Sequence, residues 1–171
     1  MKLLLQSISL LLFLSTYSFA NTIAINDDLT LLKKLVGKWR GSLEWSIDAK
    51  PEMLNLEYSI RSNGSALLEE SNQGGVEMLT IFNDQNGTLQ STHYCGLMNK
   101  PIAYLKSNKN NELVFETDVQ KSGLNKEEEA FVLSWKIGFI KGDENHFNYE
   151  YKVLNPDGSI VTRTALMEKV N

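Results

Sequence analysis

The sequence is poor in residues that cross-link chains or bind metals. Its 171 residues include one cysteine, Cys95, two histidines and three prolines. A single cysteine excludes an internal disulfide. A closed zinc site needs four ligands, and the chain has too few cysteines and histidines to supply them. We therefore expect no metal site, and a fold held by its apolar core and main-chain hydrogen bonds.

The sequence also lacks an excess of positive charge. Seventeen Lys and Arg residues stand against 21 Asp and Glu residues, which gives a formal net charge of −4. Binding to nucleic acid depends on clustered Lys and Arg that neutralise phosphates, and no basic stripe is present. This composition excludes nucleic acid as an expected partner.

Long apolar runs are absent after the first 20 residues. The run at residues 3–14 is shorter than the roughly 20 residues that span a bilayer. It follows Lys2 and precedes Ser18-Phe19-Ala20, the pattern of a secretory signal peptide cleaved before Asn21. We expect residues 1–20 to be this signal, with a membrane anchor as the alternative. The mature protein would be periplasmic or secreted, a monomer or dimer, with no stable membrane span.

Familiar catalytic motifs are missing. The chain has no Gly-x-Ser-x-Gly elbow, no His-Glu-x-x-His helix and no phosphate-binding loop, so no known reaction is indicated. This favours a protein that is not an enzyme.

The remaining pattern is one helix followed by strands. Residues 27–37 place three leucines on one stripe before a terminating glycine, which predicts a short helix. From Trp39 onward the hydrophobic period changes to two, and Asn-Gly and similar turns separate the segments. The predicted strands are 39–45, 54–60, 65–71, 76–82, 88–95, 101–107, 112–119, 130–140, 146–154 and 159–170.

Short turns join antiparallel neighbours, and a long meander loses its exposed edges only by closing. We therefore predict an all-β fold. It is a closed antiparallel up-and-down β-barrel of about ten strands, with the helix closing one end. Residues 21–171 would form this single domain.

The entry into the first strand resembles a known signature. Gly37-Lys38-Trp39-Arg40-Gly41 is similar to the GxW motif of the calycin superfamily, the lipocalins and their relatives. The resemblance implies that the helix closes the barrel and that Trp39 packs near it. It also implies that a basic residue of the last strand lies over the indole, for which Arg163 is in the right strand. Gly37, Trp39 and Arg163 are thus expected to form a structural lock, with a ligand carboxylate on Arg163 as the alternative.

Two further resemblances extend this one. The GxWxG start and the segment 74–101, which contains Thr92-His93-Tyr94-Cys95 and Asn99-Lys100-Pro101, are similar to an uncharacterised group of secreted bacterial lipocalin-like proteins. No activity comes with that likeness. The GxWxG opening also resembles nitrobindin-type haem barrels, which bind haem through a histidine near the C-terminal end. Here the last histidine is His146, on the face opposite Phe147, so the cofactor stays unknown, with haem as an alternative.

The candidate site centres on His93 and Cys95, which alternation places on one face of their strand. Three interpretations remain open: satisfied structural residues, residues of a ligand pocket, or residues of a catalytic or metal site. Glu69 and Glu70 alternate, so one of them is expected inside with Arg61 or Arg163 as partner. The predicted pocket residues are His93, Cys95, Tyr104, Tyr58 and Trp135.

The functional prediction is an exported barrel that holds a small, mostly apolar or aromatic molecule. The alternative is an enzyme that acts on a small molecule, with His93 as general acid or base. A further alternative is a haem-binding barrel. Sequence alone leaves open whether the interior is hollow, because the same inward residues line a packed barrel and an empty one.

Overall fold

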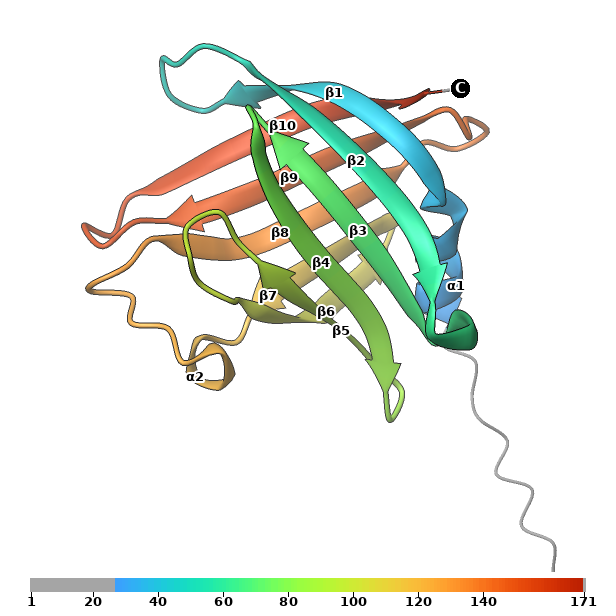
Figure 1. Cartoon of the computed structure of the whole chain (residues 1–171), viewed down its shortest axis with the longest axis horizontal. Coiled ribbons are helices and arrows are strands. Elements are labelled where there is room, and N and C mark those ends of the chain that lie inside the picture. The colour runs from blue at the N-terminus through green and yellow to red at the C-terminus, as the bar shows by residue number, and fades with distance from the viewer. Residues whose placement is uncertain (1–26, 171) are drawn as a thin grey trace, which may run out of the picture.

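The computed structural model describes residues 27–170, which form a closed barrel of ten antiparallel strands (Figure 1). Residues 1–20, the predicted signal peptide, lie outside the described residues. Each strand pairs with its neighbours in sequence, and β1 also pairs with β10, so the predicted up-and-down barrel is confirmed. The strands are β1 (Gly37–Trp45), β2 (Glu52–Arg61), β3 (Ala66–Gln73), β4 (Val76–Gln85), β5 (Thr88–Tyr94), β6 (Ile102–Lys109), β7 (Glu112–Thr117), β8 (Phe131–Phe139), β9 (His146–Leu154) and β10 (Ile160–Val170).

Helix α1 (Asp27–Leu32) closes one end of the barrel, as predicted, and a 3₁₀ turn at Lys33–Leu35 leads from it into β1. Figure 1 shows α1 at one end and the β9–β10 turn at the other. Leu29, Leu32 and Leu35 are at most 6% exposed, because the leucine stripe of α1 and the 3₁₀ turn points into the barrel. A second short helix, α2 (Val119–Ser122), follows β7, where the sequence indicated only the end of a strand.

The interior is packed solid near α1. Four large side chains there are at most 1% exposed: Phe82, Phe115, Ile137 and Phe147. The Phe147 ring packs edge to face against Trp39, with 4.8 Å between the ring centroids. The burial pattern along β1 alternates strictly between inward and outward residues, as the period of two requires. This end of the barrel is therefore core, not pocket.

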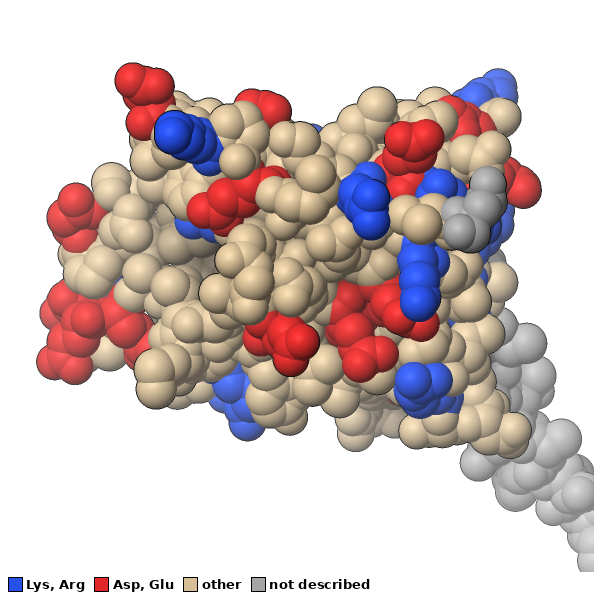
Figure 2. Space-filling model, turned by 45° about the horizontal axis from the view of Figure 1, so that its top comes forward, with Lys and Arg blue, Asp and Glu red and all other residues tan. Residues whose placement is uncertain are grey.

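The outer surface carries charges of both signs. Figure 2 shows Lys and Arg interspersed with Asp and Glu over the face in view, with no continuous basic patch on that face. Within residues 27–170, no helix is long and apolar enough to cross a membrane.

The seam between β1 and β10 is tight at Gly41. A Cβ atom built at Gly41 would lie 2.6 Å from Met167 Sδ and 2.8 Å from the Leu166 carbonyl oxygen. The carbonyl belongs to the backbone of β10 and cannot swing aside as a side chain can. Only glycine therefore allows β10 and the Met167 side chain to approach β1 this closely.

We therefore expect Gly41→Ala to lower the free energy of unfolding by about 1–3 kcal/mol, since overpacking forces backbone shifts. Urea denaturation followed by tryptophan fluorescence measures the change. Ser42→Ala, at the neighbouring exposed position, is the control and should stay within ~0.5 kcal/mol of wild type. Equal stability of Gly41→Ala and wild type would contradict the tight seam.

Candidate functional site

The barrel encloses a cavity of about 400 Å³ at the end away from α1. Its apolar walls come from β2, β4, β8 and β9. The cavity reaches the surface, because Val76 and Leu97 on its rim are 50% and 47% exposed. The main apolar wall residues are Leu54, Met78, Val132, Trp135, Tyr149 and Val153.

Small inward residues explain why this end is hollow. Ser71 on β3 and Thr80 on β4 point inward at positions where the α1 end carries leucine and phenylalanine, and both are buried. Ala130 adds a third small side chain to the wall just before β8. Short side chains cannot reach the barrel axis, so space remains beside them.

A row of four polar side chains crosses the inside of the sheet from β2 to β5. Tyr58, Glu69, Thr80 and His93 are direct cross-strand partners in the register of successive strands. Tyr58 Oη donates to Glu69 Oε2 at 2.5 Å, and Thr80 Oγ1 donates to Glu69 Oε1 at 2.9 Å. Thr80 Oγ1 also lies 2.9 Å from His93 Nδ1. The row links a buried carboxylate to an imidazole on the cavity wall.

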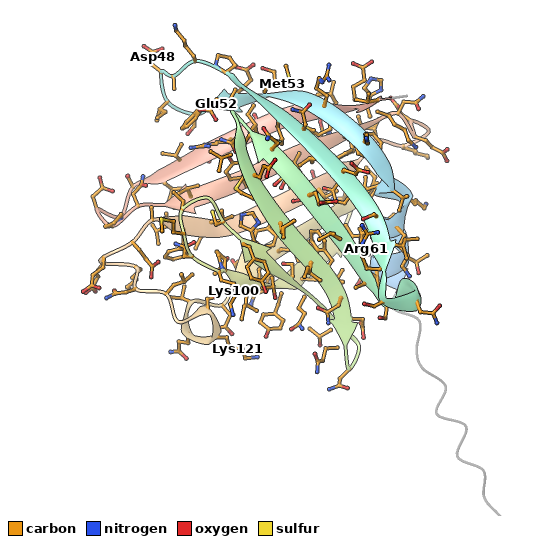
Figure 3. The ribbon with its side chains drawn as sticks, in the orientation of Figure 1. Asp48, Glu52, Met53, Arg61, Lys100 and Lys121 are labelled. Carbon is orange, nitrogen blue, oxygen red and sulfur yellow. The ribbon has the colours of Figure 1, made fainter. Side chains whose placement is uncertain are left out.

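Glu69 is an acid in the core with hydroxyl partners. Its side chain is 1% exposed, and burial raises the pKa of the carboxyl, against the hydrogen bonds from Tyr58 and Thr80 and the interaction with Tyr149. Burial, with the nearby Glu69 charge, also raises the pKa of Tyr58 and of Tyr149. The expected inward carboxylate is thus found, but the expected partner, Arg61 or Arg163, is wrong. Arg61 lies at the α1 end of β2 (Figure 3) and is exposed, whereas Glu69 is buried opposite Tyr58.

His93 is neutral at physiological pH. Burial lowers the pKa of its imidazole to about 4, opposed by a hydrogen bond with the Leu79 backbone. The Thr80 hydroxyl has one proton to give. When it donates to ionised Glu69, His93 Nδ1–H donates to Thr80, and Nε2 is left as an acceptor. Protonation of Glu69 permits the reverse order, with Nε2–H as a donor. The direction of the Thr80–His93 hydrogen bond thus depends on the tautomer of His93, and an ionised Glu69 favours Nδ1–H as the donor.

A second polar chain runs across the cavity rim around Arg163. The Arg163 guanidinium lies over the Trp45 ring, 3.4 Å from its centroid, and Nη1 donates to Tyr151 Oη at 2.8 Å. Tyr151 Oη donates to Gln73 Oε1 at 2.6 Å, and Gln73 Nε2 donates to Glu52 Oε2 at 2.6 Å. Five strands thus hold these groups in position at the open end.

The predicted pairing of Trp39 with Arg163 is wrong. The register of β1 with β10 sets Trp45 opposite Arg163 and Trp39 opposite Lys169. Lys169 Nζ accordingly lies over the Trp39 ring, 5.4 Å from its centroid, while Trp39 Nε1 donates to the Leu35 carbonyl at 2.6 Å. A basic residue of the last strand does cover the indole, but it is six positions further along than expected.

The other predicted pocket residues divide into three groups. His93, Cys95 and Trp135 lie on the cavity wall, where a role in binding stays a prediction. Tyr58 is buried beneath the cavity as the partner of Glu69. Tyr104 is placed wrongly by the prediction: its neighbour Ala103 points inward and is fully buried, while Lys121 Nζ bonds the Tyr104 hydroxyl at 3.0 Å at an exposed position.

Cys95 and His146 are placed as follows. Cys95 is the free cysteine, half-buried just after β5, and burial raises the pKa of its thiol. His146 Nδ1 lies 2.8 Å from Asp143 Oδ2, away from the cavity wall. Among the residues that the structure describes, no three His, Cys, Asp or Glu side chains gather in a group that could hold a metal ion.

Comparisons with known proteins find similarity in fold alone. No family model matches the sequence, and no curated protein matches it. A protein of unknown function from the DUF3598 family of Nostoc punctiforme is similar in structure, with a TM-score of 0.57 and 13% identity over 81% of this chain. This chain spans about half the length of that protein, 49%.

Two other barrels are more distant. The structure of EF1p2_mFAP2b bound to DFHBI matches 83% of this chain and 98% of its own, with a TM-score of 0.41 and 10% identity. A redesigned β-barrel matches 81% of this chain and 94% of its own, with a TM-score of 0.37 and 12% identity.

The low pKa of His93 predicts a pH dependence of stability. Because the unfolded chain protonates near 6.5 and the folded protein near 4, the contribution of His93 is complete above pH 6.5 and is lost as the pH falls toward 4. Between pH 7 and pH 4.5, the free energy of unfolding of wild type should fall by about 2 kcal/mol more than that of His93→Asn. This value is smaller than full burial would give, because part of the ring is accessible to solvent. Urea unfolding at the two pH values measures it.

Glu69 acts with the opposite sign, since its raised pKa makes its contribution largest at low pH and smaller as the pH rises. The comparison is therefore repeated in a Glu69→Gln background to separate the two groups. Asn148→Ala, which removes an exposed side chain that does not titrate, is the control and should keep the wild-type dependence. Parallel pH curves for wild type and His93→Asn would contradict the assignment.

Proposed function

We propose that the protein binds a small, mostly apolar molecule in the cavity at the open end of the barrel. The cavity carries the proposal. Its volume of about 400 Å³ falls in the ~300–1,000 Å³ range of ligand pockets, which are largely apolar with a few placed polar groups. Trp135, Val132 and Val153 supply the apolar wall, and His93 and Arg163 supply polar groups.

We further propose that the chain is an exported, calycin-like barrel. The ten-stranded closure with a helix at one end supports the second part, as does the position of Gly37 and Trp39 where the helix region enters β1. The pattern of residues 1–20 supports export to the periplasm or beyond the cell.

Catalysis by His93 is the second candidate, and the polar row favours it because His93 is hydrogen-bonded to a group that is itself tied to a carboxylate. The imidazole is neutral at pH 7 and can accept a proton. A pKa of about 4 makes it a weak base, however, since effective catalysts have pKa values near the working pH. The same geometry serves better as a fixed hydrogen-bonding group for a ligand.

The test uses N-phenyl-1-naphthylamine, a neutral aromatic probe that fluoresces in apolar surroundings. Wild type should bind it, and Val132→Trp, which fills the cavity from its β8 wall, should weaken binding by at least about tenfold. Ser134→Trp adds the same side chain to the outer face of β8, where its neighbours Glu116 and Lys152 point to solvent, and should bind like wild type.

Denaturing mass spectrometry of the purified protein is the complementary measurement, because a bound compound can survive purification. Absence of probe binding by wild type, together with no co-purified compound, would end the proposal. Equal loss of binding in Val132→Trp and Ser134→Trp would show that the probe binds elsewhere.

A further inference from the structure

Arg163 is a cation on the wall of the cavity without an acidic partner. None of the ion pairs in the described part of the chain includes it. Glu52, the carboxylate on the same wall, accepts from the Gln73 amide instead. A half-buried charge without a counter-charge is unfavourable. An anion bound at this point of the cavity would therefore stabilise the guanidinium.

The guanidinium is also held in place. Trp45 lies under it at 3.4 Å, Tyr151 accepts from Nη1 at 2.8 Å, and Tyr151 is in turn fixed by Gln73 at 2.6 Å. Cation–π stacking and a hydrogen-bond chain leave the group little freedom to lose on binding, which favours affinity.

Hydrogen-bonding capacity remains unused on Arg163. A guanidinium has five N–H donors, and the structure gives this one a single hydrogen bond, to Tyr151. Its Nε atom is buried with no partner. Planar anions such as carboxylate and sulfonate are the acceptors that match such a fork of donors.

The inner end of the cavity has the opposite character. Glu69 lies behind the wall there, and His93 carries no charge at pH 7, so neither of these groups supplies a positive charge for an anion. Trp135 and Val132 offer apolar surface instead. A ligand with one charged end therefore has one favourable orientation, with its charge at the rim.

We propose that the ligand is an amphipathic anion whose acidic group sits on Arg163 at the cavity rim and whose apolar body lies inward against Trp135. This inference rests on the proposed function, since it names the class of molecule that the same cavity binds. It assigns Arg163 a binding role in addition to its contact with Trp45.

The experiment compares two probes with the same aromatic body. 8-Anilinonaphthalene-1-sulfonate is N-phenyl-1-naphthylamine with an added sulfonate, so the ratio of their dissociation constants reports the anionic group alone. Wild type should bind the sulfonate at least about tenfold more tightly, the gain typical of one charge-assisted hydrogen-bonded contact. Fluorescence titration at low and moderate salt measures both constants.

Arg163→Met should abolish the preference, so that the two probes bind this variant with equal affinity. Lys169→Met is the matched control: it removes one positive charge and one cation–π contact from the same strand, over Trp39 at the packed end, and should keep the preference. Arg163→Lys retains the charge without the planar fork and should keep part of it. Should Arg163→Met unfold, Arg163→Gln, which keeps a neutral N–H donor at this position, replaces it.

The outcomes separate the two proposals. Binding of both probes with equal affinity by wild type, or a preference that survives in Arg163→Met, would overturn the assignment of an anionic ligand and leave the cavity as a binding site. Failure of wild type to bind either probe, together with no co-purified compound, would instead remove the proposed function. Near-ultraviolet circular dichroism of each variant confirms that the fluorescence comes from folded protein.

Discussion

Main-chain pairing between β1 and β10 is the interaction on which the rest of this structure depends. It joins the first strand to the last, removes both free edges, and turns a meander into a closed wall. Its register also decides which residues meet: Trp45 faces Arg163, and Trp39 faces Lys169. Gly41 permits the close approach at the centre of the seam. The enclosed cavity exists only because this seam is made.

The barrel is divided along its length into a packed end and a hollow end. Near α1, leucines from the helix and aromatic residues from the strands fill the interior, and burial of such apolar surface supplies most of the folding free energy. At the other end, inward serine, threonine and alanine leave space, and two hydrogen-bonded chains place polar groups around it. The apolar core near α1 can therefore support a hollow at the other end of the same barrel.

The hydrophobic period and the turn residues were enough to predict the strands, their antiparallel order, the closing helix and the closed barrel. They could also place His93 on an inward face and one of Glu69 and Glu70 inside. Pairing across β1 and β10 lay beyond them, because register depends on strand ends and bulges that no local pattern fixes. The Trp39–Arg163 error follows from this, as does the missed role of Thr80. Tyr104 was misplaced because the aromatic residue suggested burial, whereas its neighbour Ala103 is the inward one.

The row of Tyr58, Glu69, Thr80 and His93 ties the chemistry of the cavity to the lengths of three hairpins. Each member sits opposite the next only because the intervening turns contain the number of residues that they do. A shift of the β2–β3 pairing by one residue would turn Glu69 outward and set Leu68 or Glu70 opposite Tyr58. The register of these three hairpins therefore decides the hydrogen bonds of the interior as much as the identity of its side chains does.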